Sequence, residues 1–178
     1  MEFKAKIMDE AAVRRSMARI THEIIEKNRG ADGICLLGIK RRGIPLAKML
    51  GENIKKFEGV DVPIGHIDIT HYRDDRAEPV SAPDADGCEI PCDVSSFNII
   101  IVDDVLYTGR TVRAAIDSIF RFGRPKSIQL AVLIDRGHRE LPIRPDFVGK
   151  NIPTSKSELV SVLLDEVDGE CGVCLYNI

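Results

Sequence analysis

The sequence predicts a single α/β domain, with a doubly wound, mostly parallel sheet and helices on both of its faces. Three short apolar runs, residues 34–38, 99–102 and 129–134, are typical of strands that are buried on both sides. The first two runs are each followed by a loop and an amphipathic helix, which is the order of a parallel β-α unit. No repeat and no linker interrupts the 178 residues, so we expect one domain spanning residues 1–178.

The clearest of these units is the segment 98–122. Its strand contains four consecutive β-branched residues and ends in Asp103 and Asp104, where a parallel strand reaches the carboxyl edge of its sheet. The sequence TGRT at 108–111 predicts a turn. Apolar side chains then recur at helical spacing up to Phe120, shortly before a glycine and a proline that end the helix.

The turn that leads into this helix is a candidate phosphate site. Backbone N–H groups in the first turn of a helix lack intrahelical partners and lie at the positive end of the helix dipole. Gly109 permits close approach of an anion, and the hydroxyls of Thr108 and Thr111 can donate to it. Because Asp103 and Asp104 would repel a bare phosphate, the pattern favours a ribose phosphate whose hydroxyls or metal ion meet the carboxylates. The alternative is an ordinary strand–turn–helix in which the two aspartates cap the turn.

A basic turn follows the strand at 34–38. Lys40, Arg41 and Arg42 precede Gly43 and a helix with an apolar side. Since the carboxyl ends of parallel strands meet at one edge of a sheet, these cations should lie beside the aspartates and offer a place for a more highly charged anion. The alternative is a merely solvated basic turn.

The N-terminal part predicts a helix that begins after the N-cap Asp9 and ends near residue 29. Apolar residues between 13 and 24 recur at helical spacing, and the other faces carry six Arg, Lys or His side chains. Considered alone, such a basic face is more often simply solvated.

Between the two units, residues 62–73 alternate like a strand with one polar face, and periodicity then disappears. Residues 74–93 hold seven acids and one arginine, a local charge of −6, so the rest of the chain carries −3 − (−6) = +3. An aperiodic stretch of this length inside a compact domain is typical of a lid or a disordered insertion. Further strands are predicted at 159–164 and 172–176, separated by an acidic turn.

Composition limits the functional classes. The chain is 44% hydrophobic and 30% charged, has no apolar run near 18 residues and begins without the apolar core of a signal peptide. Five cysteines fit no disulfide framework, which indicates reduced thiols and a cytoplasmic protein. Cys171 and Cys174, with Cys88 and Cys92, leave a zinc site as a minor alternative to small apolar side chains. Residues three apart converge only in a turn, however.

Residues 102–111, VDDVLYTGRT, resemble the signature with which type I phosphoribosyltransferases bind phosphoribosyl pyrophosphate (PRPP). The Leu106–Tyr107 insert and Arg110 are most similar to one bacterial branch, the bifunctional pyrimidine-operon attenuation regulators and uracil phosphoribosyltransferases. The basic turn resembles the family's pyrophosphate loop, with Arg42 as the matching arginine. Residues 135–156 resemble the hood that covers the base. The resemblance extends over nearly the whole chain.

This resemblance implies a type I phosphoribosyltransferase fold with a small hood contributed by about 135–158 and a flexible acidic loop at about 73–93. It implies conversion of uracil and PRPP to UMP and pyrophosphate, with Mg²⁺ carried by PRPP rather than by a dedicated metal site of the protein. It also implies binding of pyrimidine-operon leader mRNA with UMP as co-effector, which promotes transcription termination. A homodimer or higher homo-oligomer is expected, and no membrane partner.

The residues that the resemblance implicates form five groups. The catalytic group is Asp103, Asp104 and Arg73. PRPP or UMP would be bound through ribose and 5′-phosphate by Val102, Asp103, Asp104, Val105, Leu106, Tyr107, Thr108, Gly109, Arg110 and Thr111. Pyrophosphate would be bound by Lys40, Arg41, Arg42 and Gly43, and the base pocket under the hood would include Asp135 and Arg136. RNA would be bound by Arg15, Arg19, His22, Lys27, His138, Arg139, Arg144 and Lys150.

Other readings stay open at this point. A uracil salvage enzyme without RNA binding would look the same throughout the active site. A hypoxanthine or adenine phosphoribosyltransferase would share the phosphate loop but differ at Leu106–Tyr107. A regulator that has lost turnover is disfavoured, because every expected PRPP contact is present.

Overall fold

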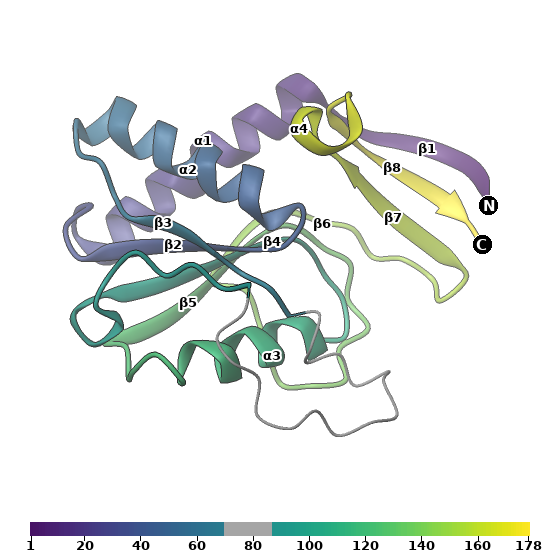
Figure 1. The fold of residues 1–178 in the computed structure, drawn as a ribbon. Coiled ribbons are helices and arrows are strands. Elements are labelled where there is room, and N and C mark those ends of the chain that lie inside the picture. Colours follow the sequence, from purple (N-terminus) through teal and green to yellow (C-terminus); the bar gives the residue numbers. More distant parts are fainter. Residues whose placement is uncertain (70–86) are drawn as a thin grey trace.

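The computed structural model describes residues 1–69 and 87–178, and its centre is a five-stranded sheet (Figure 1). All neighbouring strands are parallel, in the order β3-β2-β4-β5-β6. The chain leaves β2 toward β3 and then returns to β4, so the strand order reverses between β2 and β4. In open α/β sheets this switch point is where ligands bind. The bounds are β2 (Ile34–Ile39), β3 (Ile64–Ile67), β4 (Asn98–Leu106), β5 (Ser127–Asp135) and β6 (Phe147–Asn151).

Three long helices cover the two faces of this sheet. Helices α1 (Glu10–Asn28) and α2 (Gly43–Glu58) lie on one face, and α3 (Arg110–Ile119) lies on the other (Figure 1). Alternate strand residues divide between two apolar clusters. Leu36 and Ile100 pack in the cluster that includes α1 and α2, whereas Leu37 and Ile101 pack in the cluster that includes α3. The predicted doubly wound fold is therefore confirmed.

The ends of the helices follow local signals in the sequence. The Asp9 carboxylate accepts a hydrogen bond from the backbone N–H of Ala12 at 2.7 Å, which confirms the predicted cap of α1. Helix α3 ends at Ile119, one residue short of its predicted apolar stripe. Phe120, the last residue of that stripe, is the C-cap of the helix and is 53% exposed.

A second, smaller sheet has the antiparallel order β1-β8-β7, with the short helix α4 between β7 and β8. We call this sheet with α4 the hood. Two of its strands were predicted, but β1 was not recognised, because only Met8 of its eight residues is buried. The bounds are β1 (Glu2–Asp9), β7 (Glu158–Leu163), α4 (Asp165–Asp168) and β8 (Gly172–Asn177).

The segment 135–158, expected to contribute to the hood, has a different place. Its residues 147–151 form β6, the edge strand of the main sheet, because Phe147 and Val148 pair with β5. The remainder runs from the end of β5 to the start of β7 and so connects the main sheet to the hood.

The region after β3 is only partly described. β3 is shorter than the predicted strand 62–73. Most of the predicted loop 73–93, including Arg73, lies outside the described residues. Where the chain is described again, Glu89 forms a β-bridge with His66, and a 3-10 helix, η2 (Val94–Ser96), leads into β4. Within residues 1–69 and 87–178, no helix is long and apolar enough to cross a membrane.

Candidate active site

The carboxyl ends of β2 and β4 form the floor of an open pocket of about 410 Å³. It lies at the point where the strand order reverses, and the two sequence-predicted anion loops converge on it. The pocket is lined by Ile39, Lys40, Arg41, Arg42, Ile69, Asp103, Asp104, Val105 and Thr111. Carboxylates and cations thus share one cavity, as a ligand with both hydroxyls and phosphates requires.

Asp103 and Asp104 were expected where the strand ends, but β4 continues to Leu106, and the two aspartates differ in environment. Asp103 is buried, whereas Asp104 is partly exposed. Desolvation raises the pKa of Asp103 well above its usual value, and the neighbouring charge of Asp104 raises it further. The backbone N–H of Asp104 donates to the Asp103 carboxylate at 2.9 Å, and that of Val105 donates to the Asp104 carboxylate at 2.8 Å. These bonds fix both carboxylates relative to the strand end.

The predicted turn 108–111 is shorter in the structure: Thr108 and Gly109 precede α3, and Arg110 and Thr111 already belong to its first turn. Gly109 is the N-cap of α3 with φ of 95°, a left-handed conformation that favours glycine. As a glycine it has no side chain that could cap the first turn of α3, which leaves room there for a ligand phosphate. The Thr108 hydroxyl accepts from the Arg110 backbone N–H at 3.3 Å. The side chain of Arg110 points to Glu140, its partner at 2.7 Å.

The basic turn after β2 is packed tightly against β4. A Cβ atom on Gly43 would lie 2.3 Å from the carbonyl oxygen of Val102, so only glycine fits there. The peptide bond between Lys40 and Arg41 is cis. The ammonium of Lys40 forms an ion pair with Asp68 at 3.0 Å. The turn is therefore held against the strand that carries the aspartates.

Arg42 connects this turn to the hood. Its guanidinium donates two hydrogen bonds to the carboxylate of Asp168 in α4, Nε to Oδ2 at 3.2 Å and Nη2 to Oδ1 at 2.7 Å. These bonds lower the pKa of Asp168. Sequence reasoning treated Asp168 only as part of an acidic turn. No local pattern could have revealed the contact, since the two residues are 126 positions apart.

Of the two residues predicted for the base pocket, Asp135 is the last residue of β5 and Arg136 follows it. Asp135 pairs in register with Leu106 of β4 and accepts from Arg139, while Arg136 is buried. The Arg136 guanidinium donates to the hydroxyl of Thr154 at 3.2 Å and to the carbonyl of Glu158 at 2.7 Å. Neither Asp135 nor Arg136 lines the 410 Å³ pocket.

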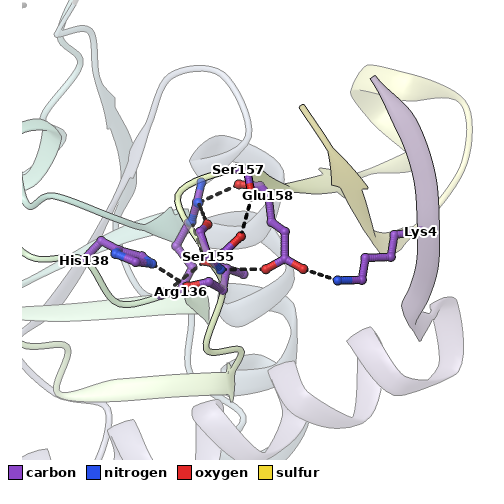
Figure 2. A network of polar contacts seen from close by, with 7 residues as sticks. Lys4, Arg136, His138, Ser155, Ser157 and Glu158 are labelled. Carbon is purple, nitrogen blue, oxygen red and sulfur yellow. Dashed lines mark hydrogen bonds and ion pairs between the residues drawn. The ribbon is translucent and has the colours of Figure 1, made fainter.

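Figure 2 shows that Arg136 is the centre of a network reaching the first strand. The Glu158 carboxylate accepts from the backbone N–H of Ser155 at 2.6 Å and pairs with Lys4 of β1. His138 Nε2 donates to the carbonyl of Thr154. This network joins the end of β5 to both outer strands of the hood, a function that the sequence did not indicate.

The segment after Arg136 packs on the phosphate loop. The guanidinium carbon of Arg136 lies 4.1 Å from the centre of the Tyr107 ring, and Arg139 donates to the Tyr107 carbonyl at 2.9 Å. The backbone N–H groups of Glu140 and Leu141 both donate to the carbonyl of Thr108. The conformation of the phosphate loop therefore depends on residues more than 25 positions further along the chain.

The cations predicted to bind RNA are divided between two places. In the first, α1 lies along β6: Arg19 donates to the carbonyls of Val148 and Gly149, and Lys27 pairs with Asp146. Arg15, Arg144 and Lys150 are exposed, and His22 stacks on Phe57 with ring centres 4.2 Å apart. In the second place, beside the phosphate loop, lie His138 and Arg139 with the partners given above.

Comparison with known proteins agrees with this geometry. The family "Phosphoribosyl transferase domain" matches residues 5–166. "Bifunctional protein PyrR" of Acetivibrio thermocellus is 61% identical over 175 residues, which are 98% of this chain and 95% of that protein. The proteins of the same name from Bacillus subtilis and Clostridium perfringens are 58% and 56% identical, each covering 99% of both chains.

Solved structures of other phosphoribosyltransferases share the fold. A hypoxanthine phosphoribosyltransferase of Trypanosoma cruzi, solved as a ternary substrates complex, superposes with a TM-score of 0.76 at 18% identity, covering 98% of this chain and 96% of that one. A hypoxanthine-guanine phosphoribosyltransferase of Bacillus anthracis gives 0.71 at 19% identity over the full length of both chains. At such identities the likeness concerns the fold alone.

Proposed function

The chain belongs to the phosphoribosyltransferase family, in the branch of the bifunctional PyrR proteins, and from this premise we propose that it has two functions. It transfers the phosphoribosyl group of PRPP to uracil, giving UMP and pyrophosphate. It also binds the leader mRNA of the pyrimidine operon in response to UMP and PRPP, and so promotes transcription attenuation. The observation that carries the enzymatic part is the convergence of two aspartates and three cations on one pocket at the switch point.

In the enzymatic reaction, the bond between the anomeric carbon of ribose and pyrophosphate breaks, and positive charge develops on the sugar. Asp103 and Asp104 bind the ribose hydroxyls, and the negative charge of Asp104 favours the developing cation. The amides and hydroxyls at 108–111 bind the 5′-phosphate. Lys40, Arg41 and Arg42 neutralise the departing pyrophosphate. The protein itself contributes orientation and charge rather than covalent chemistry.

Mg²⁺ fits this site as an ion carried by the substrate. The pocket offers carboxylate oxygens, the ligands that Mg²⁺ prefers, from Asp103 and Asp104. Residues 1–69 and 87–178 contain no cluster of three or more His, Cys, Asp or Glu side chains able to hold a metal by themselves. When bound with PRPP, the ion neutralises charge on the pyrophosphate oxygens. Arg73, which lies outside the described residues, is proposed to meet the same pyrophosphate.

The test of the enzymatic proposal is pyrophosphate release from PRPP with uracil, orotate, hypoxanthine or adenine as acceptor. Uracil alone should support rapid release. A preference for hypoxanthine or adenine would refute the assignment of the acceptor. The double variant Asp103→Asn/Asp104→Asn should lose UMP formation while keeping its far-UV circular dichroism spectrum. Arg144→Gln, at an exposed site outside the pocket, is the matched control and should keep wild-type turnover.

The regulatory part is supported by the surface formed by α1 and β6. Arg19 and Lys27 of α1 contact the segment 146–149. The exposed cations Arg15, Arg144 and Lys150 lie within a few residues of these contacts in the sequence. Such a surface can bind phosphates, and its affinity should fall with salt.

Filter binding of leader RNA, with and without UMP, tests this function. UMP should strengthen binding, and Arg15→Ala should weaken it several-fold, while Lys55→Ala at the exposed end of α2 should not. Salt-insensitive binding that ignores UMP would instead favour the alternative, a uracil salvage enzyme without RNA regulation.

Two further properties belong to the proposal. The protein acts in the cytoplasm, where its five free cysteines stay reduced. It assembles as a homodimer or larger homo-oligomer, which light scattering after size-exclusion chromatography would measure. A monomer at micromolar concentration would refute that assembly.

A further inference from the structure

The contact between Arg42 and Asp168 joins the turn that lines the pocket to the hood. Arg42 lies in the turn that lines the pocket, while Asp168 ends the short helix α4 of the hood. The two hydrogen bonds run side by side from one guanidinium edge to one carboxylate, at 3.2 and 2.7 Å. This bidentate arrangement fixes the plane of the guanidinium as well as its position.

Asp168 is itself held firmly. Its Oδ2 atom also accepts from the backbone N–H of Leu164 at 2.9 Å, and its own N–H donates to the Leu164 carbonyl at 2.7 Å. The side chain of Asp168 is 17% exposed and that of Arg42 is 35% exposed, so water screens the pair only in part. Arg42 also lies within the field of Asp104, which lines the same pocket.

These contacts have a consequence for anion binding. A free arginine on a loop loses side-chain entropy when it binds a ligand. Arg42 is already ordered by Asp168, so that loss is incurred on folding and not on binding. The outer edge of the guanidinium keeps donors for an anion in the pocket.

We propose that Asp168 is a positioning residue for the pyrophosphate end of PRPP, acting through Arg42 and linking the hood to the pyrophosphate turn. This inference rests on the proposed phosphoribosyl transfer. Asp168 does not touch the substrate. Its carboxylate holds Arg42 at the pocket wall, so that the turn and the hood present the pyrophosphate site as one unit.

The experiment compares Asp168→Asn with Glu166→Gln. Glu166 lies in the same helix and pairs with the exposed Lys48 at 3.0 Å, so its variant removes a like charge without disturbing Arg42. We expect Asp168→Asn to raise KM for PRPP about tenfold, with KM for uracil and kcat within about twofold of wild type. Glu166→Gln should leave all three at wild-type values. Asp168→Glu, which keeps the charge, should restore part of the loss.

A double-mutant cycle separates positioning from a general loss of structure. With Arg42→Ala already in place, adding Asp168→Asn should change KM for PRPP by less than twofold, because the residue through which Asp168 acts is absent. An unchanged or lowered KM for PRPP in Asp168→Asn would overturn the inference. So would a rise in this KM that is as large when Asp168→Asn is added to Arg42→Ala as when it is made in the wild type. Absence of transfer by the wild type would instead refute the proposed function, so the two failures are distinguishable.

Discussion

Replacing Arg136 by methionine should lower the free energy of unfolding by about 3 kcal/mol. Arg136 is buried, and its 2.7 Å hydrogen bond to the Glu158 carbonyl is charge-assisted, which is worth about 1.5–3 kcal/mol. The guanidinium stacked 4.1 Å from the Tyr107 ring contributes about 0.5–1 kcal/mol more. Methionine fills a similar volume, so the change removes these polar contacts without leaving a large cavity.

Urea denaturation followed by far-UV circular dichroism measures this effect, because the chain has no tryptophan for fluorescence. The expected loss corresponds to a fall in Tm of roughly 6–12 °C for a domain of this size. Arg144→Met, which removes an exposed arginine from the same segment, is the control and should change stability by less than about 0.5 kcal/mol. A loss below about 1 kcal/mol for Arg136→Met would mean that the network of Figure 2 does not hold the hood to the sheet.

Three further predictions concern other parts of the molecule. Folding raises the pKa of Asp103, so its protonated side chain favours the folded state at low pH, and this contribution is lost as pH rises through the raised pKa. Asp103→Asn should therefore be more stable than wild type at pH 7 but inactive. Thermal melts and turnover measurements would show the two effects. Gly43→Ala should lower the free energy of unfolding by about 1–3 kcal/mol and sharply raise KM for PRPP, because the added methyl group would overlap the Val102 carbonyl. Kinetics equal to wild type would contradict this prediction. The pKa of Glu158 is lowered chiefly by its hydrogen bond with Lys4, so the contribution of the pair is present above the usual carboxyl pKa and is lost as pH falls through the lowered pKa. Amide exchange in β1 should then speed up, and Glu158→Gln should show that faster exchange already at pH 7.

Much of the fold could be predicted from the sequence because local patterns specify it. The β-branched strand before Asp103 and Asp104, the glycine at the start of α3 and the basic turn after β2 each carry a local signal. Parallel topology then places their ends at one edge, which is why two separate loops line one pocket. The resemblance to phosphoribosyltransferases is likewise confirmed by the family match.

The rest depends on contacts between residues far apart in the chain. β1 carries little hydrophobic signal, because it is stabilised by pairing with β8 rather than by a buried face of its own. Arg136 was predicted to bind the ligand at a strand end, but its guanidinium donates a hydrogen bond to the carbonyl of Glu158 in the hood. No pattern in one sequence identifies the carbonyl that a given arginine will meet.

The pairing of β1 with β8 also bears on how the protein is made. Residues 2–9 leave the ribosome well before their partner strand, residues 172–177, which is synthesised more than 160 positions later. Through most of translation β1 is therefore an unpaired strand, while the parallel sheet can form from β2 onward. The hood closes last, and with it the contact of α4 with the pyrophosphate turn. A nascent chain would thus acquire its phosphate loop well before the arginine of that turn is held in place.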